Sequence, residues 1–443
     1  MQPGKARRPN MIFIVADDLG YADLGCYGGR PADFGEVSPR LDAMAAAGIR
    51  FTKGYSNSPV CSPTRFALMT ARYQYRLRGA AEEPIRSGTR GNPLLGLPHE
   101  HPTLPSLLRD AGYKTALIGK WHLGYPPHFG PLRSGYQEYF GPMSGGVDYF
   151  GHSSSGKEHD LWEGEQEVWK DGCYLTDLLT QRAVDYIERE AGGPAPFMIS
   201  LHYTAPHWPW ETRDDAGRTP KVKDNLFDLS GGNINVYRRM IHHMDEGIGR
   251  VLDTLAAKGV LDDTLVVFTS DNGGERFSDN WPLVGGKMDL TEGGIRVPWI
   301  AQWPAVIKAG RVTSQHCMTM DWSATLLDAG GAQAAATHPL DGVSLLPLLQ
   351  GGEEFERPMH WRMNHRGQRA LRQGPWKYLR VDDNDYLFDV DTDERERANQ
   401  ARLEPERLHA MREEWERWNA TMPPIPEDAQ VSLGYSYKDM PQR

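Results

Sequence analysis

The chain has 443 residues, and its 59 acidic side chains outnumber its 49 basic ones, which gives a formal charge of -10. This balance argues against nucleic acid or an anionic membrane surface as the main partner, so an anionic substrate would need a local basic pocket. No apolar run approaches the roughly 20 residues of a membrane span. Because the N-terminal residues lack the apolar stretch of a secretory signal, we expect a cytoplasmic protein, or a periplasmic or secreted one if a leader has been removed.

The first predicted element is a buried strand that ends in two carboxylates. Residues 11–16 form a short apolar run, and Asp17 and Asp18 follow it directly. A helix is predicted from Pro39 to Gly48, because Ser38 can cap the free N–H groups of a first turn and proline suits the start of a helix.

Helices and continuous apolar strands then alternate along the chain. Helices are expected at 103–111, 176–190 and 236–257, and strands at 115–118, 197–201 and 264–269. This alternation predicts an α/β fold with an open, mostly parallel sheet between helices. In such sheets ligands bind at the carboxyl ends of the strands.

The pattern changes after about residue 349. Two strand-like runs, 376–380 and 386–390, are separated by a turn-rich stretch of acidic and amide residues, and a charged amphipathic helix is predicted at 404–419. We therefore expect a catalytic domain over residues 1–349. Residues 350–443 are expected to form a smaller α+β domain with an antiparallel sheet, a helix and a tail.

Two predicted strand ends carry oxygen ligands. Asp17 and Asp18 follow one strand, and Asp271 and Asn272 follow another. If both strands lie in one parallel sheet, three carboxylates and an amide oxygen converge, and oxygen ligands suit calcium or magnesium better than zinc. Each pair is also common in ordinary turns, so neither pair alone predicts a metal site.

Cys61 stands apart from the other cysteines, Cys26, Cys173 and Cys317. The four are widely spaced without a CxxC pair, so the sequence indicates neither a disulfide framework nor a thiolate zinc site. Ser62 and Pro63 predict a helix start, which places Cys61 at the positive end of a helix, where an anion is stabilised. By itself this setting fits either a thiolate nucleophile or a small buried residue.

Six segments carry a family resemblance. One is Cys61-Ser-Pro-Thr-Arg65 with Leu68-Met-Thr70 and Arg72, and the others lie at 10–21, 112–124, 205–207, 269–273 and 286–298. In this order they resemble the motifs of the type I (formylglycine-dependent) sulfatases, arylsulfatase-like members of the alkaline phosphatase superfamily. The C-terminal Tyr386-Leu-Phe-Asp389, with Asp393 and Asn399, is similar to the hairpin of that family's smaller domain.

The resemblance implies an alkaline-phosphatase-like sandwich that hydrolyses sulfate esters to inorganic sulfate and an alcohol or phenol. It also implies that a formylglycine-generating or equivalent maturation enzyme converts Cys61 to Cα-formylglycine. The hydrated aldehyde is a geminal diol, so one hydroxyl can attack sulfur and the other can help to expel the sulfate.

Roles for individual residues also follow from the resemblance. One divalent cation, most simply Ca²⁺ with Mg²⁺ as the alternative, would be held by Asp17, Asp18, Asp271, Asn272 and the modified Cys61. Arg65 would anchor the modified side chain, Lys120 would neutralise sulfate oxygens, and His122 would accept a proton. His207 and Lys287 would assist the leaving alcohol as general acid and electrostatic partner.

Two other functions stay open at this point. A phosphodiester or phosphonate monoester hydrolase could use the same metal and diol, and an unmodified homologue could bind anions without catalysis. The substrate, whether an aryl, choline, steroid or carbohydrate sulfate, and the oligomeric state are also open.

Several features lie outside the shared motifs. The family usually has glycine where Ala71 stands, so we expect catalysis to persist while recognition by the maturation enzyme weakens. Segments 76–101 and 144–169 match no motif and are expected to shape the substrate pocket. Trp208, Trp210 and Trp281 are candidates for stacking on a sugar or aryl ring, and His202 is interpreted as a core histidine.

Overall fold

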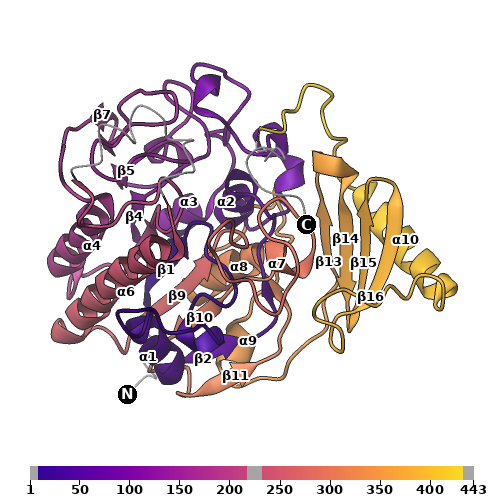
Figure 1. Ribbon diagram of the computed structural model, residues 1–443. Coiled ribbons are helices and arrows are strands. Elements are labelled where there is room, and N and C mark those ends of the chain that lie inside the picture. The colour runs from indigo at the N-terminus through magenta and orange to yellow at the C-terminus, as the bar shows by residue number, and fades with distance from the viewer. Residues whose placement is uncertain (1–7, 217–231, 433–443) are drawn as a thin grey trace.

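The computed structural model describes residues 8–216 and 232–432, so the end of the predicted tail lies outside the described residues. Its main feature is a ten-stranded sheet (Figure 1). From one edge to the other the strands are β11 (Arg311–Thr313), β2 (Ile49–Phe51), β10 (Trp299–Gln302), β9 (Thr264–Ser270), β1 (Asn10–Ala16), β8 (Phe197–His202), β4 (Lys114–Gly119), β5 (Glu138–Gly141), β6 (Trp162–Glu163) and β7 (Gln166–Glu167).

The centre of this sheet is parallel. β9, β1, β8, β4 and β5 run in one direction, whereas β10 and β6 run the opposite way and pair antiparallel with both of their neighbours. Ala16 pairs with Ser270, Val15 with His202, and Gly119 with His202, so the four strands β1, β9, β8 and β4 end at the same edge of the sheet. The register therefore places the polar residues after these strands side by side.

Helices cover both faces of the sheet, as expected for an α/β sandwich. Side chains of β1 alternate between the two faces: Ile12 and Ile14 join one core cluster, whereas Phe13 joins the other. The first face is covered by α1 (Pro39–Ala47), α4 (Leu175–Glu190) and α6 (Ile234–Ala257). The second is covered by α2 (Cys61–Thr70), α3 (Leu104–Asp110) and α8 (Thr319–Ala329). Near them lie two short helices, α7 (Glu292–Ile295) and α9 (Leu346–Leu349).

A second, antiparallel sheet lies at the C-terminal side, drawn orange to yellow in Figure 1. Its strands are β13 (Met359–Arg362), β14 (Arg369–Gln373), β15 (Trp376–Val381) and β16 (Asn384–Asp389). One face packs on α10 (Pro405–Asn419). The other packs on the main body around the two-stranded sheet of β3 (Gly54–Tyr55) and β12 (Cys317–Met318), in the cluster that contains Cys61.

The predicted helices and strands are present, with ends that differ by at most two residues. One local prediction was wrong: the Ser38 side chain does not cap α1. Instead, a carboxylate from α6, Asp245, accepts hydrogen bonds from the backbone N–H groups of Arg40 and Leu41, at 2.9 and 2.8 Å. A tertiary contact thus satisfies the free donors of this helix start.

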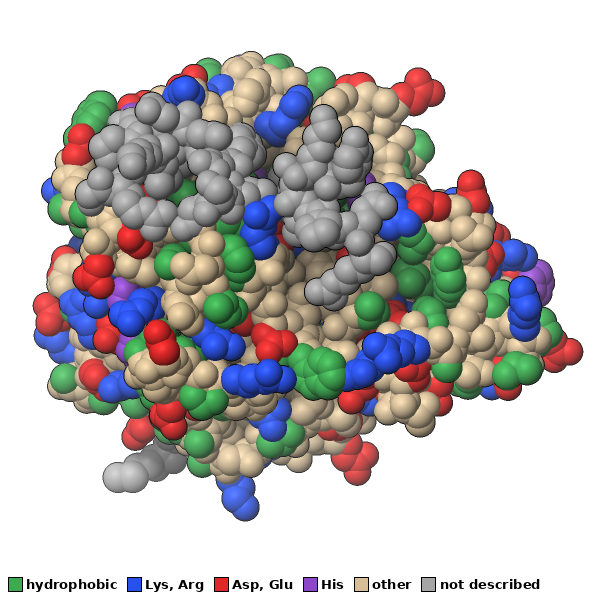
Figure 2. Space-filling view, viewed as in Figure 1, with side chains coloured by type: hydrophobic (Ala, Val, Ile, Leu, Met, Phe, Trp, Pro, Cys, Tyr) green, Lys and Arg blue, Asp and Glu red, His purple; other side chains and the backbone are tan. Residues whose placement is uncertain are grey.

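The surface is mixed in charge. Figure 2 shows basic and acidic side chains interspersed over the viewed face. Among the described residues, no helix is both long enough and apolar enough to cross a bilayer.

Candidate active site

The four predicted metal ligands meet where β1 and β9 end. The amide of Asn272 donates to Oδ1 of Asp18 at 2.7 Å, and the backbone N–H of Asp18 donates to Oδ1 of Asp271 at 3.3 Å. Asp17 is completely buried, and burial together with Asp271 raises its pKa well above the usual value. Three carboxylates are therefore buried next to one another, as predicted from two parallel strands that end at the same edge of the sheet.

Cys61 is the first residue of α2 and is 1% exposed. Burial raises the pKa of its thiol to about 11, even though Lys120 and Lys287 lie nearby. Burial thus opposes ionisation of the thiol in spite of the helix start, which disfavours the thiolate nucleophile that the sequence left open.

Arg65 lies one helical turn after Cys61 and holds the acidic cluster in place. Its guanidinium donates to Oδ2 of Asp271 through Nε and Nη2, at 3.1 and 2.9 Å. Its Nη1 donates to the carbonyl of Lys120 at 3.1 Å. With the side chain 1% exposed, these bonds fix the first turn of α2 against the ends of β9 and β4.

Two buried lysines neutralise the carboxylates. Lys120 donates to Oδ2 of Asp17 at 2.5 Å, and Lys287 donates to Oδ2 of Asp18 at 2.6 Å. Burial alone would raise the pKa of Asp18, but the ammonium groups of Lys287 and Lys120 lower it to about 2. Burial lowers the pKa of Lys287, but Asp18 and Glu275 more than offset this effect, so this ammonium group keeps its proton.

His122 is oriented for accepting a proton. Its Nε2 lies 2.8 Å from the carbonyl of Ile85, and because a carbonyl only accepts, this nitrogen carries the hydrogen. Burial, followed by Lys120, lowers the pKa of His122 well below the usual value, so the ring is neutral and Nδ1 has a free lone pair. Nδ1 is buried without a hydrogen-bond partner among the described residues.

His207 lies on the other side of Asp18. Its Nδ1 is 2.5 Å from the carbonyl of Trp208, and its Nε2 is 3.5 Å from Oδ2 of Asp18. Burial lowers the pKa of His207 well below the usual value, although Asp18 opposes this shift. The imidazole is therefore neutral, with Nδ1 as the donor.

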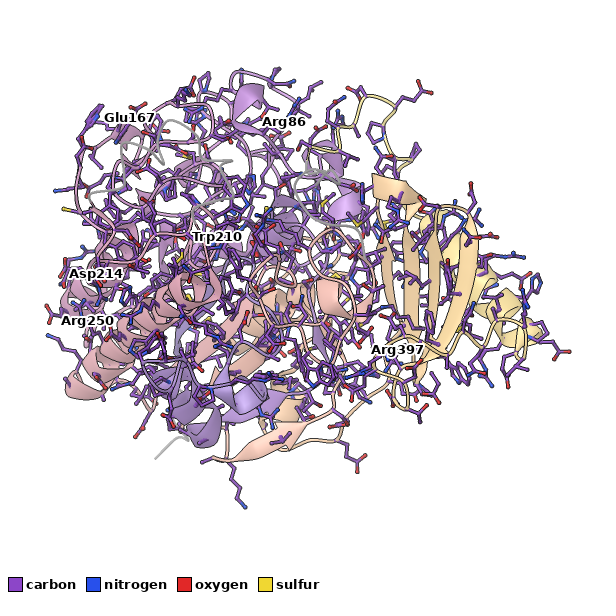
Figure 3. All side chains as sticks on the ribbon, viewed as in Figure 1. Arg86, Glu167, Trp210, Asp214, Arg250 and Arg397 are labelled. Carbon is purple, nitrogen blue, oxygen red and sulfur yellow. The ribbon has the colours of Figure 1, made fainter. Side chains whose placement is uncertain are left out.

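A cavity of about 500 Å³ connects these groups. Cys61, His122, His207 and Lys287 all line it. Both segments that match no motif contribute to its wall: 76–101 through Ile85, Arg86, Ser87 and Gly88, and 144–169 through Ser144, Gly145, Gly146 and Ser155. Figure 3 labels Arg86, which lies toward the top of the view.

The predicted tryptophans differ in position. Trp208 lines the cavity. Trp210, labelled in Figure 3, is 4% exposed and packs edge-on against Phe277. Trp281 is exposed under the guanidinium of Arg395 and does not line the cavity. Of the three, only Trp208 is placed to contact a ligand in this cavity.

The donor set fits a hard divalent cation. Oδ1 of Asp17 and Oδ1 of Asn272 are buried without a hydrogen-bond partner among the described residues. Unpaired buried acceptors beside a cluster of carboxylates are the groups that Ca²⁺ or Mg²⁺ takes as ligands. Asp17, Asp18 and His207 also form a group whose ligand atoms lie within 4.8 Å of one another.

The structure reveals contacts that the sequence interpretation missed. His202 was interpreted as a core histidine, and it is 3% exposed, but its Nδ1 lies 3.3 Å from Nη1 of Arg65. The sequence could have indicated this contact, because His202 lies at the carboxyl end of a predicted strand, where ligands bind in parallel sheets. A Cβ at Gly145 would lie 2.4 Å from the His122 ring, so only glycine allows the wall to approach this closely.

Ala71 ends α2 in the left-handed conformation, with φ of 53° and ψ of 27°. Its N–H donates to the carbonyl of Ala67 at 2.9 Å. This is a backbone conformation that favours glycine, so the departure from the family pattern has a conformational rather than a chemical consequence.

Comparisons with known proteins agree with this geometry. A family model described as Sulfatase matches residues 9–332. N-acetylgalactosamine-6-sulfatase of Canis lupus familiaris is 32% identical over 390 residues, which cover 81% of this chain and 69% of that protein. Steryl-sulfatase of Homo sapiens is 28% identical over an alignment that covers 95% of this chain and 90% of that protein.

A solved structure shares the whole architecture. That of Ps i-CgsB in complex with k-i-k-neocarrahexaose matches with a TM-score of 0.83 and 30% sequence identity. The match covers 96% of this chain and 94% of the other.

Proposed function

Starting from the fact that this chain belongs to the sulfatase family and hydrolyses sulfate esters, we propose that it acts on saccharide sulfates through a modified Cys61 and one divalent cation. The observation that carries the proposal is the cavity that joins Cys61, His122, His207 and Lys287 next to the oxygen cluster. A saccharide substrate is supported by the N-acetylgalactosamine-6-sulfatase relative and by the oligosaccharide in the Ps i-CgsB complex.

The cation would be held by Asp17, Asp18, Asp271 and Asn272, with calcium the expected ion. When bound, it polarises the sulfate group and favours ionisation of a hydroxyl at position 61. The chain itself supplies three carboxylates and three cations, Arg65, Lys120 and Lys287, in direct contact. A divalent ion added to these groups and to Glu275, which faces Lys287, would make the local charge more positive and so favour an anionic sulfate ester.

Cys61 would act after conversion to formylglycine, whose hydrate supplies a hydroxyl nucleophile and a second hydroxyl that permits release of sulfate. Because the thiol is almost completely buried, a maturation enzyme could reach it only before α2 packs. Arg65 keeps the first turn of α2 fixed on Asp271, so position 61 is oriented toward the cation site.

The remaining residues handle charge and protons. His122 accepts a proton at Nδ1, because Nε2 is committed to the Ile85 carbonyl. Lys120, which contacts Asp17 and lies near Cys61, stabilises negative charge on the side of the site where the nucleophile forms. Lys287 keeps its proton and offers positive charge to the departing oxygen, and His207 becomes a donor when the anionic substrate raises its proton affinity.

A panel of esters tests this proposal. We expect turnover of N-acetylgalactosamine and galactose sulfates, and of a nitrophenyl sulfate, with little hydrolysis of a matched phosphate diester or phosphonate monoester. Hydrolysis of the phosphorus esters at the higher kcat/KM would overturn the assignment in favour of a phosphodiesterase. Turnover restricted to aryl or steroid sulfates would overturn the saccharide assignment.

A further inference from the structure

A second group of metal-ligating side chains lies outside the catalytic cavity, in the segment that leads to α4. It consists of His152, His159 and Asp171, and one ligand atom from each lies within 4.8 Å of the others. None of the three lines the catalytic cavity. The neighbouring Glu167 is labelled at the top of Figure 3, far from the labelled Trp210.

His152 is already oriented as a metal ligand. Its side chain is completely buried, and its Nε2 lies 3.1 Å from the carbonyl of Cys173. A carbonyl can only accept, so Nε2 carries the hydrogen and Nδ1 carries the lone pair. Nδ1 has no hydrogen-bond partner among the described residues. A carbonyl that fixes the tautomer while the other nitrogen faces a ligand is the arrangement seen around metal-bound histidines.

The other two side chains complete the group. The ring of His159 stacks on Trp169, with centroids 4.7 Å apart and planes at 15°. Neither of its ring nitrogens makes a hydrogen bond within the described part of the chain, and Nδ1 lies 3.5 Å from Oε2 of Glu167. A proton on Nδ1 would face that carboxylate, which leaves Nε2 as the ligand atom. Asp171 is exposed, so an ion can enter from solvent.

We propose that His152, His159 and Asp171 bind a zinc ion. Two imidazoles and one carboxylate are a donor set that suits zinc and not calcium, with water in the fourth position. Ligand atoms of a tetrahedral zinc site are roughly 3.4 Å apart. The ligand atoms lie within 4.8 Å of one another, so binding would require the exposed Asp171 and the partly exposed His159 side chains to turn slightly toward the ion.

The ion would brace one wall of the catalytic cavity. His152 and His159 belong to a stretch that pairs with itself through the bridges Val147–Ser154 and Ser153–His159. This stretch begins beside Gly145 and Gly146, which line the cavity, and it returns to the cavity at Ser155. Asp171 lies in the turn before α4, so zinc would tie this wall to the main body.

Zinc binding to the holoenzyme tests the proposal. The protein is first saturated with Ca²⁺, which occupies oxygen ligands and competes poorly for imidazole, and is then titrated with Zn²⁺ alone. We expect wild-type protein to bind one Zn²⁺ more per chain than H159A and D171N, by elemental analysis after gel filtration. Zn²⁺ should also raise the melting temperature of the wild type but not of these variants.

H99A is the matched control, because His99 is a surface histidine with a side chain 67% exposed. It should bind as much zinc as the wild type. Equal zinc content in the wild type, H159A and D171N would overturn the proposal. If H159A does not fold, D171N decides, because this carboxylate is exposed and its replacement leaves the core intact.

Discussion

Two buried clusters of charge lie in this molecule, and they differ in how completely their oxygens are paired. In the first, between the two sheets, Lys377 lies 3.0 Å from Oε1 of Glu292 and 2.8 Å from Oε1 of Glu396. The remaining oxygens accept from the hydroxyl of Tyr55 at 2.8 Å and from the backbone N–H of Glu292 at 2.7 Å. Every carboxylate oxygen in this cluster therefore has a hydrogen-bond donor or, in the case of Oε1 of Glu396, the Lys377 ammonium group as a close ion-pair partner.

The second cluster, at the ends of β1 and β9, is incomplete because two of its oxygens have no hydrogen-bond partner among the described residues. Lys120 pairs with one oxygen of Asp17, but the other oxygen is 4.0 Å from Arg65, and Oδ1 of Asn272 has no partner among the described residues. The charged side chains of both clusters are almost completely buried, so burial does not distinguish the clusters. The difference teaches that buried acceptors with neither a hydrogen-bond donor nor a close cation, rather than buried charge as such, mark the place where we propose that a cation and a substrate bind.

The largest expected effect separates function from stability in the incomplete cluster. We expect D17N to lower turnover about 10⁴-fold. The cation is expected to supply several kcal/mol of transition-state stabilisation, and D17N removes one of its charged ligands. In chelator, D17N should lose less free energy of unfolding than the variant K377M in the first cluster, because relief of the repulsion between Asp17 and Asp271 offsets part of the cost of leaving Lys120 without its carboxylate partner. Turnover assays and urea unfolding in chelator measure both, and a large loss of stability would erase the contrast between the clusters.

A smaller catalytic effect should depend on the leaving group. H207A and K287A should slow hydrolysis of a sugar sulfate about 10²- to 10³-fold while affecting a nitrophenyl sulfate little, because a phenolate leaves without help. K120A serves for comparison, since its contact with Asp17 on the nucleophile side should matter for both esters. Equal losses on both esters for H207A and K287A, with metal content intact, would instead place these residues on the sulfate or the metal.

In the fully paired cluster the effect should fall on stability. K377M leaves Glu396 buried without its cation and leaves Glu292 with the more distant Arg296, so we expect the free energy of unfolding to fall by about 3–5 kcal/mol. Activity per folded molecule should not change. The matched control is R366M, between β13 and β14 of the same sheet, because Arg366 pairs with Asp382 at the surface and such pairs contribute about 1 kcal/mol or less. Similar losses for both variants would contradict the account.

The smallest expected effect concerns the end of α2. A71G should raise the free energy of unfolding by up to about 1 kcal/mol, because the residue adopts a left-handed conformation that glycine tolerates. Turnover of the modified protein should stay the same. A410G in the middle of α10 is the control and should have the opposite sign. Destabilisation by A71G in chemical unfolding would show that the Ala71 side chain contributes more than its backbone strain removes.

The sequence predicted the parts of this architecture that depend on local pattern and parallel register. Asp17 and Asp271 could be placed together because each directly follows an apolar strand, and strands of a parallel sheet end at the same edge. The partners of these residues were not predictable in this way. Arg65 reaches Asp271, and Asp245 caps α1, through side chains that are more than 200 positions apart from their partners in the chain.

Short elements and side-chain tautomers also escaped prediction. β6 and β7 have two residues each, too few for a periodic pattern. The free Nδ1 of His122 depends on the carbonyl of Ile85, and that of His152 depends on the carbonyl of Cys173. Such orientation arises only when separate loops meet, so the chemistry of both histidines had to come from the structure.

The central claim is that the nucleophile develops from Cys61 at the head of α2. Mass spectrometry of the peptide that contains Cys61, from protein made together with a formylglycine-generating enzyme, tests it most directly when paired with the specific activity of the same preparation. We predict loss of the sulfur, an aldehyde that reacts with a hydrazide, and activity proportional to the modified fraction. Fully active protein with an intact thiol at Cys61 would contradict the account.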